Sequence, residues 1–184
     1  MSTPFLMPIS GAEFLPSPNH DDRPAGTEPD LLVIHNISLP PDEYGGPWIA
    51  DLFLNRLDPS AHPYFAQIHR LKVSAHALVR RNGTVLQFVS LEKRAWHAGE
   101  SCFENRSNCN DYSIGIELEG SDRIPYSDAQ YQSLTRITRE IMGHYPHITP
   151  ERITGHEHIA PGRKTDPGPA FDWERYLSTL ENPG

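Results

Sequence analysis

The residues best suited to chemistry lie in one short stretch near the C-terminal end of the sequence. Residues 155–168 read GHEHIAPGRKTDPG and combine two histidines, a lysine and an aspartate with five prolines and glycines. Proline fixes φ and glycine permits positive φ, so a loop of this composition follows a defined path. We therefore expect a rigid loop that presents His156, Lys164 and Asp166 to one point. Neutral imidazole and carboxylate together form a ligand set that suits Zn²⁺.

A catalytic zinc site usually has three protein ligands and one open position, so this loop needs a partner elsewhere in the chain. His35 is one candidate among ten histidines, and it follows the apolar run LLVI, which is typical of a buried central strand. His35 could equally cap a core strand. His158 is an alternative ligand, because a His-x-His pair on an extended segment places both rings on one side. Spacing alone makes His35, His156 and Asp166 one ligand set among several. Most other histidines, among them His76 and His97, are expected at the surface or bonded to backbone groups.

Two further residues could assist a metal-activated water. Glu117 lies in the alternating segment YSIGIELE, and a buried carboxylate there would have a raised pKa that suits a general base. Alternatively, Glu117 and Glu119 form the solvated face of an amphipathic strand. Lys164 lies two residues before Asp166 and could stabilise a developing oxyanion, or it could simply be solvated.

Strands and one long helix are expected to position these groups. Val73 to Arg80 alternates, Asn82-Gly83 follows, and a second strand-like run comes next, which predicts a hairpin with a type I′ turn. Ser127 and Gln130 form a capping box before a helix over 128–144. The remaining expectations are an irregular arm over 1–29 with a short strand at 11–15, a strand over 31–35, a short helix over 48–54, irregular chain over 55–70, a short strand at 153–154 and a helix over 173–180 capped by Asp172.

This mixture predicts an α/β fold with a mixed central β-sheet flanked by helices, in a single domain that spans residues 1–184. Loop 36–47, rich in proline and glycine, follows His35 directly and would act as a lid or wall of the site, or as a static surface loop.

Composition excludes several classes of protein. A net charge of −8 argues against a nucleic-acid partner, and no apolar run is long enough for a membrane helix. The N-terminal residues show no secretory signal and two cysteines are too few for a disulfide framework, so we expect a cytoplasmic protein. Nothing indicates an obligate dimer, so we expect a monomer. G-x-S-x-G, P-loop, G-x-G-x-x-G, His-Glu-x-x-His and Cys-x-x-Cys motifs are all missing.

Five blocks of sequence carry a family resemblance. They are VIHNISLPP (33–41), VSAH (73–76), RAWHAG (94–99), NDYSIGIELEG (110–120) and residues 154–169. In this order they resemble the zinc-dependent N-acetylmuramoyl-L-alanine amidases, a family related to peptidoglycan-recognition proteins. The resemblance extends from about residue 16 to residue 173.

The resemblance implies zinc held by His35, His156 and Asp166, Glu117 as the catalytic acid and base, and Lys164 as a transition-state stabiliser. It implies that His158 is no ligand. The implied reaction is hydrolysis of the amide between the lactyl group of (1,6-anhydro)-N-acetylmuramic acid and L-alanine, with a small-molecule muropeptide as substrate in cell-wall recycling.

Two positions depart from the family pattern. Lys72 and Asn108 stand where arginines are expected, and neither binds a carboxylate in the bidentate way of arginine. Binding of the peptide carboxylates is therefore expected to move to other groups, Arg106 among them. The competing hypotheses are a peptidoglycan-binding module without catalysis, which would typically lack a ligand or the site acid, and a periplasmic amidase.

Overall fold

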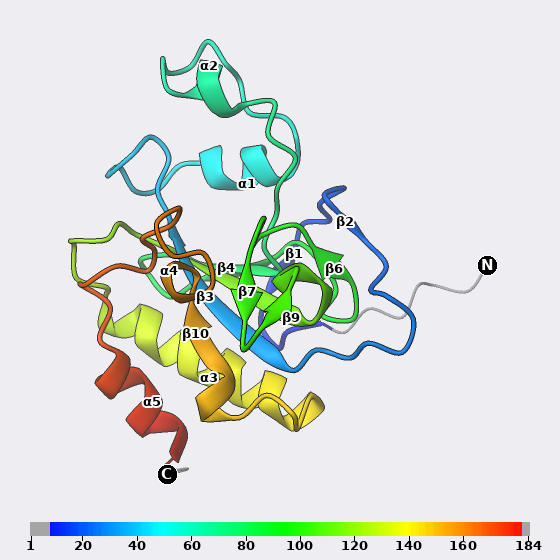
Figure 1. The fold of residues 1–184 in the computed structure, drawn as a ribbon. Coiled ribbons are helices and arrows are strands. Elements are labelled where there is room, and N and C mark those ends of the chain that lie inside the picture. Colours follow the sequence, from blue (N-terminus) through cyan, green and yellow to red (C-terminus); the bar gives the residue numbers. More distant parts are fainter. Residues whose placement is uncertain (1–7, 182–184) are drawn as a thin grey trace.

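The centre of the molecule is one mixed sheet of six strands in the order β1-β5-β4-β9-β3-β10 (Figure 1). The computed structural model describes residues 8–181, so residues 1–7 of the predicted arm and residues 182–184 lie outside the described part. The β4–β5 pair is antiparallel and the other four pairs are parallel. The predicted mixed sheet flanked by helices is confirmed. Its strands are β1 (Glu13–Phe14), β3 (Leu31–Ile37), β4 (Ala77–Val79), β5 (Val85–Gln87), β9 (Ser113–Glu119) and β10 (Ile153–Gly155).

Strand β3 lies between β9 and β10 and is parallel to both. Because side chains alternate along a strand, its residues divide between the two faces of the sheet. Leu32 and Ile34 belong to one core, whereas Leu31 and Val33 belong to another. His35 has the same parity as Val33, and its partner across the β3–β9 pair is Glu117. The sheet therefore brings His35 and Glu117 to the same face, near the carboxyl ends of two neighbouring strands.

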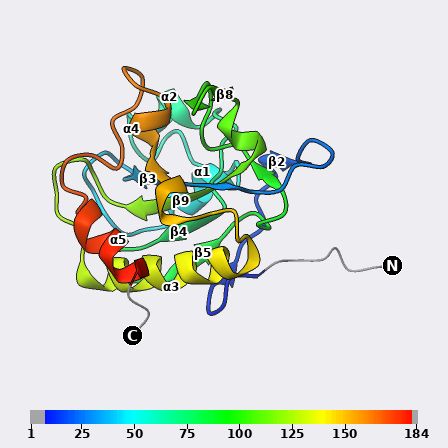
Figure 2. The same cartoon turned by 60° about the horizontal axis from the view of Figure 1, so that its bottom comes forward.

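Helices α3 (Asp128–His144) and α5 (Trp173–Glu181) cover the face that holds Leu32 and Ile34 (Figures 1 and 2). Their apolar side chains share one core with the sheet, among them Tyr131, Leu134, Ile137, Ile141 and Tyr176. The predicted capping box is confirmed: Ser127 Oγ accepts from the Gln130 N–H at 3.2 Å, and Gln130 Oε1 accepts from the Ser127 N–H at 3.1 Å. Asp172 Oδ1 accepts from the Arg175 N–H at 2.9 Å, so the predicted cap of the last helix is confirmed too.

On the opposite side of the sheet lie α1 (Trp48–Phe53) and α2 (Phe65–Ile68) (Figure 1). Helix α1 matches the prediction, but α2 falls in a stretch expected to be irregular. Its single turn follows His62-Pro63 and is anchored by the fully buried Phe65. The small elements that were not predicted are α4 (His156–Ile159), the pair β2 (His20–Asp21) and β6 (Arg94–Ala95), the pair β7 (Cys102–Phe103) and β8 (Arg106–Ser107), and two 3₁₀ turns, Cys109–Asp111 and Pro150–Arg152.

The hairpin between β4 and β5 is confirmed, but its predicted type I′ turn is wrong. A type I′ turn needs positive φ at both central residues. Only Gly83 has positive φ here, at 84°, and its N–H donates to the Arg80 carbonyl at 2.8 Å. The connection is therefore a turn over residues 80–83 that ends in a left-handed glycine, as in the three-residue hairpin loops. Asn82 Oδ1 instead accepts from the Thr84 N–H at 3.0 Å.

Candidate metal centre

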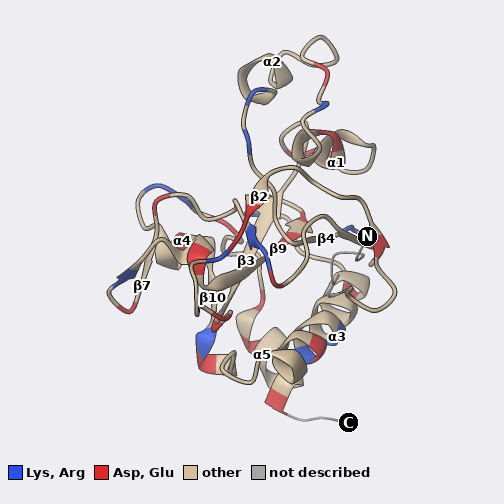
Figure 3. Ribbon diagram, turned by 90° about the vertical axis from the view of Figure 1, so that its right-hand side faces the viewer, with Lys and Arg blue, Asp and Glu red and all other residues tan. Residues whose placement is uncertain are grey.

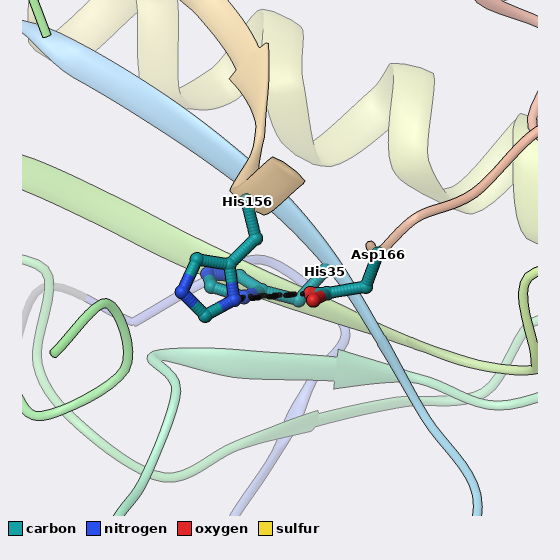
Figure 4. Close-up of side chains that lie close together, drawn as sticks. All are labelled: His35, His156 and Asp166. Carbon is teal, nitrogen blue, oxygen red and sulfur yellow. Dashed lines mark hydrogen bonds and ion pairs between the residues drawn. The ribbon is translucent and has the colours of Figure 1, made fainter. Parts of the chain in front are cut away.

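Three side chains from two distant parts of the sequence meet at the carboxyl ends of β3 and β10. His35 lies on β3, His156 follows β10 as the first residue of α4, and Asp166 lies on the loop after α4. His35 Nδ1 is 2.9 Å from His156 Nδ1 and 3.2 Å from Asp166 Oδ2, and His156 Nδ1 is 3.1 Å from the same oxygen. Figure 4 shows the three side chains pointing toward one another. They form a group that could hold a metal ion.

The loop that carries Asp166 is tied to the sheet and to α4. The Asp166 carbonyl accepts from the Glu157 N–H at 2.9 Å, and the Pro167 carbonyl accepts from Tyr126 Oη at 2.8 Å. Gly155 permits this close packing, because a Cβ there would lie 2.8 Å from Pro167 Cδ. The loop therefore has the defined path expected from its composition.

The contacts on the far sides of the imidazole rings favour metal binding. His156 Nε2 is 3.0 Å from the Ala98 carbonyl, which can only accept, so this nitrogen carries the hydrogen and Nδ1 has the lone pair. His35 Nε2 is 2.8 Å from His97 Nδ1. Each of the two histidines thus has one nitrogen held by the protein and one turned toward the centre, as metal-ligating histidines usually do.

The charge state of the cluster also suits a cation. Burial lowers the pKa of His35 to about 4, so its ring is neutral at pH 7. Burial raises the pKa of Asp166, but the imidazole rings of His156 and His35 lower it by more, and the carboxyl is ionised at neutral pH. When Nδ1 of both rings carries no hydrogen, the two nitrogens and the carboxylate oxygen present lone pairs to one point, which a cation between them would stabilise. Two imidazoles and one carboxylate are the donor set of many catalytic zinc sites.

Glu117 is buried beside this cluster, so the hypothesis of a solvated strand face is wrong. Only 9% of its surface is exposed, and Glu119 on the same face is also buried. Burial raises the pKa of Glu117 well above its ordinary value, the Asp166 carboxylate raises it further, and the Lys164 ammonium lowers it. Among the described residues, Glu117 Oε2 has no hydrogen-bond partner. The carboxyl is therefore available to exchange a proton with a bound molecule.

A cavity of about 370 Å³ opens over the cluster. Its polar end holds the three candidate ligands together with Glu117 and Lys164. Lys164 is exposed, and its ammonium forms no hydrogen bond or ion pair within residues 8–181. The other walls are mainly apolar and come from loop 36–47, from α1 and α2 and from the chain before β4, with Leu39, Phe53, Tyr64, Ile68, Val73 and Trp96 among the lining residues.

Loop 36–47 is a wall of this cavity, and its tip is fixed to the hairpin. The buried carboxylate of Glu119 accepts from the Gly45 N–H at 2.6 Å and from the Arg81 N–H at 3.0 Å. The Arg80 guanidinium donates to the Gly46 carbonyl at 2.9 Å. Movement of the loop as a lid stays a prediction.

Two other candidate residues, His158 and Arg106, lie away from the cluster. His158 is exposed, and its proposed role as a ligand is not supported, because residues 156–159 are helical and a helix turns positions i and i+2 to different sides. Arg106 pairs with Asp30 at 2.7 Å and lies 3.7 Å from the Tyr112 ring centroid. Neither Arg106 nor Asn108 lines the cavity.

Sequence reasoning missed the residues behind the cluster. His97 lines the cavity and contacts His35, and Asn110 Oδ1 accepts from the N–H groups of His97 and Ala98 at 3.1 and 2.8 Å. Burial and the neighbouring rings of His35 and His76 hold the pKa of His97 well below its ordinary value. The signal in the sequence is the block RAWHAG, which contributes to the family resemblance and contains His97.

The family model for N-acetylmuramoyl-L-alanine amidases matches residues 25–169. The chain belongs to this amidase family. All three residues of the candidate metal centre lie within the matched range, whereas strand β1 and helix α5 lie outside it.

Individual relatives agree with the family match. The 1,6-anhydro-N-acetylmuramyl-L-alanine amidase AmpD of Enterobacter cloacae is 58% identical over 169 residues, which cover 92% of this chain and 90% of the relative. A crystal structure of a selenomethionine AmpD derivative superposes with a TM-score of 0.91 at 56% identity, covering 93% of this amidase and 95% of that chain. The amidase AmiD from E. coli, solved in complex with the substrate anhydro-N-acetylmuramic acid-L-Ala-D-γ-Glu-L-Lys, has a TM-score of 0.59 at 32% identity and covers 86% of this chain and 60% of that one.

Proposed function

We propose that this amidase uses zinc to hydrolyse the amide between the lactyl group of 1,6-anhydro-N-acetylmuramic acid and L-alanine. The observation that carries the proposal is the meeting of His35, His156 and Asp166 beside the buried Glu117, in one cavity. The activity for which the 58% identical relative from Enterobacter cloacae is named supports the choice of the anhydro sugar and of the bond. A small muropeptide is the expected substrate, and removal of the stem peptide would serve cell-wall recycling.

His35, His156 and Asp166 would hold the metal through Nδ1, Nδ1 and a carboxylate oxygen. When bound in such a site, Zn²⁺ lowers the pKa of water to about 7 and polarises a carbonyl group. The outer nitrogens of the two histidines are already hydrogen-bonded, so little rearrangement of their rings is needed on binding.

Glu117 would move the proton. Its free Oε2 accepts a proton from the attacking water as the new C–O bond forms at the amide carbon. The protonated carboxyl then gives this proton to the alanine nitrogen while the C–N bond breaks. The raised pKa of Glu117 suits both steps, because a carboxyl that titrates nearer neutrality can take and release a proton at working pH.

Lys164 would stabilise the oxygen of the attacked carbonyl. Its ammonium faces the cavity without a partner in residues 8–181, so it can donate to an oxyanion there. Losing one such donor commonly lowers kcat by about 10²–10³-fold.

A peptidoglycan-binding module without catalysis is disfavoured, because the ligand set and the buried acid are present together and the relatives carry amidase names. No helix within residues 8–181 has the length and apolar character to cross a membrane. Figure 3 shows Lys and Arg positions interspersed with Asp and Glu along the ribbon, and the net charge of −8 favours a small substrate over a nucleic acid. The cytoplasmic location and the monomeric state stay predictions.

Mass-spectrometric product analysis tests the proposal. Anhydro-muramoyl-tripeptide is incubated with zinc-loaded protein, with chelator-treated protein and with zinc-loaded Glu117→Ala. We expect free tripeptide and anhydro-muramic acid from the first sample only. Binding of the muropeptide without cleavage in all three samples would place the protein among recognition modules, and equal cleavage by Glu117→Ala would remove Glu117 from the mechanism.

A further inference from the structure

His97 contacts the side of His35 that faces away from the other ligands. His35 Nε2 and His97 Nδ1 are 2.8 Å apart, and the rings meet edge to face, with centroids 5.0 Å apart. Two neutral ring nitrogens at this distance share one hydrogen, so one ring donates and the other accepts. The choice matters, because it decides whether His35 Nδ1, which faces His156 and Asp166, carries a lone pair or a hydrogen.

Ser113 on β9 determines that choice. His97 Nε2 is 3.1 Å from Ser113 Oγ, and the same hydroxyl donates to the Cys109 carbonyl at 2.5 Å. A hydroxyl has one hydrogen, so Ser113 Oγ can only accept from His97, whose Nε2 must carry the hydrogen. In the neutral His97 ring Nδ1 is then the acceptor. His35 therefore donates from Nε2 and keeps the lone pair of Nδ1 for the metal.

The backbone around His97 holds the ring in place for its contact with His35. Gly115 on β9 lies under the ring, and a Cβ there would lie 2.5 Å from His97 Cγ. Asn110 fixes the N–H groups of His97 and Ala98, and the Ala98 carbonyl takes the outer N–H of His156. One short segment, His97 and Ala98, thus holds the outer nitrogens of both imidazole ligands.

We propose that His97 is a positioning residue: with Ser113 behind it, it fixes His35 in the Nε2–H tautomer that can bind the metal. The inference rests on the proposed zinc site, but not on the proposed reaction. Removing a partner that orients a metal-ligating histidine commonly lowers the metal affinity by about 10–100-fold.

Two substitutions at His97 separate the effect of its hydrogen bond to His35 from the effect of the volume of its ring. Asparagine carries an acceptor oxygen near the position of His97 Nδ1, whereas leucine fills the space without an acceptor. We expect His97→Leu to weaken zinc binding by about 10–100-fold in a competition titration with a chromophoric chelator. We expect His97→Asn to bind zinc about tenfold more tightly than His97→Leu.

Nitrogen NMR of the metal-free proteins gives a second readout, independent of activity. Labelled His35 should show the Nε2–H tautomer in the wild-type protein and in His97→Asn, and a mixture of tautomers in His97→Leu. The matched control is His76→Leu. His76 is buried and its ring centroid is 5.7 Å from that of His97, but it bonds to the Gly115 N–H and the Lys93 carbonyl and not to a ligand. The His76→Leu variant should have a lower thermal midpoint, and the zinc affinity of its folded form should be unchanged.

The outcomes separate the two proposals. If the wild-type protein binds zinc but His97→Leu binds it equally well and keeps the tautomer, the positioning role is overturned and the zinc site stands. Equal losses of affinity in His97→Leu and His76→Leu would also overturn it, since the effect would then be one of packing. A wild-type protein that binds no zinc would overturn the metal centre and this role together.

Discussion

A methyl group added at Gly115 should weaken both the fold and the metal centre. The strand position has no positive φ, so the backbone itself tolerates alanine. The new Cβ would instead clash with the ring that packs over the strand, because it would lie 2.5 Å from His97 Cγ and 2.8 Å from His97 Cδ2. Ordinary contact begins near 3.4 Å, so the ring must move by roughly 1 Å. A ring displaced that far loses its 2.8 Å hydrogen bond to His35 unless His35 moves with it.

The expected sizes follow from this displacement. Overpacking of a buried site costs about 1–3 kcal/mol, and the reduced freedom of the unfolded chain returns about 0.4–1 kcal/mol. The net loss of about 1–2 kcal/mol should lower the thermal midpoint by roughly 2–8 °C for a chain of this length. Zinc affinity should fall by about 10–100-fold, because His35 loses its fixed orientation.

Thermal unfolding of the metal-free protein and a zinc competition titration measure the two effects. Gly143→Ala is the matched control, since Gly143 has ordinary φ on α3 and a Cβ there meets nothing within 4 Å. It should keep zinc affinity and raise stability slightly, as Ala does in a helix. Gly115→Ala protein with unchanged zinc affinity would refute the account of how His97 and His35 are held, whatever its thermal midpoint.

Other substitutions test the remaining contacts. Glu117→Gln should stabilise the metal-free protein at pH 7 by about 1.4 kcal/mol for each unit by which burial raises the pKa of Glu117. The gain should grow as the pH rises above about 4.5 and vanish at lower pH, where the carboxyl is protonated in the folded and the unfolded state. Urea unfolding at a series of pH values measures this dependence. Asp166→Ala should lose bound zinc and activity together, and full zinc occupancy by elemental analysis would contradict its role as a ligand. Lys164→Ala should keep zinc and lose about 10²–10³-fold in kcat; an unchanged kcat would leave Lys164 as a solvated residue. Glu119→Gln should cost about 1–3 kcal/mol and speed proteolytic cleavage within residues 40–47, because an amide NH₂ then faces a backbone N–H; cleavage at the wild-type rate would show that the loop is held by other contacts.

Local patterns predicted much of the fold and part of the site. The helix over 128–144 was predictable because its apolar spacing and its capping box are both encoded within a few residues. His35 follows the apolar residues of β3 and His156 follows β10, and parallel strands bring their carboxyl ends to one edge. By contrast, α2 depends on the burial of Phe65 against distant residues, which outweighs the breakers around it.

Burial on both faces of a strand was the main obstacle at the site. The alternation in β9 indicated one apolar and one wet face, yet all seven of its residues are buried, because chain segments from elsewhere cover the second face. The state of Glu117 was therefore undecidable from its own segment. The role of His97 was hidden for the same reason: its partners Ser113 and Gly115 become neighbours only when the sheet has formed.

The order of strands in the sheet has a consequence for synthesis of the chain. Strand β3 pairs with β9 on one edge and β10 on the other, and both lie much later in the sequence. At about 5–20 residues per second, a ribosome needs roughly 4–15 s after β3 to reach β9. During this interval the apolar run 31–34 has neither edge paired and neither face covered by its final neighbours. The nascent chain therefore carries an apolar strand with unprotected edges, and the metal ligands can meet only after β10 and the loop that follows it have been made.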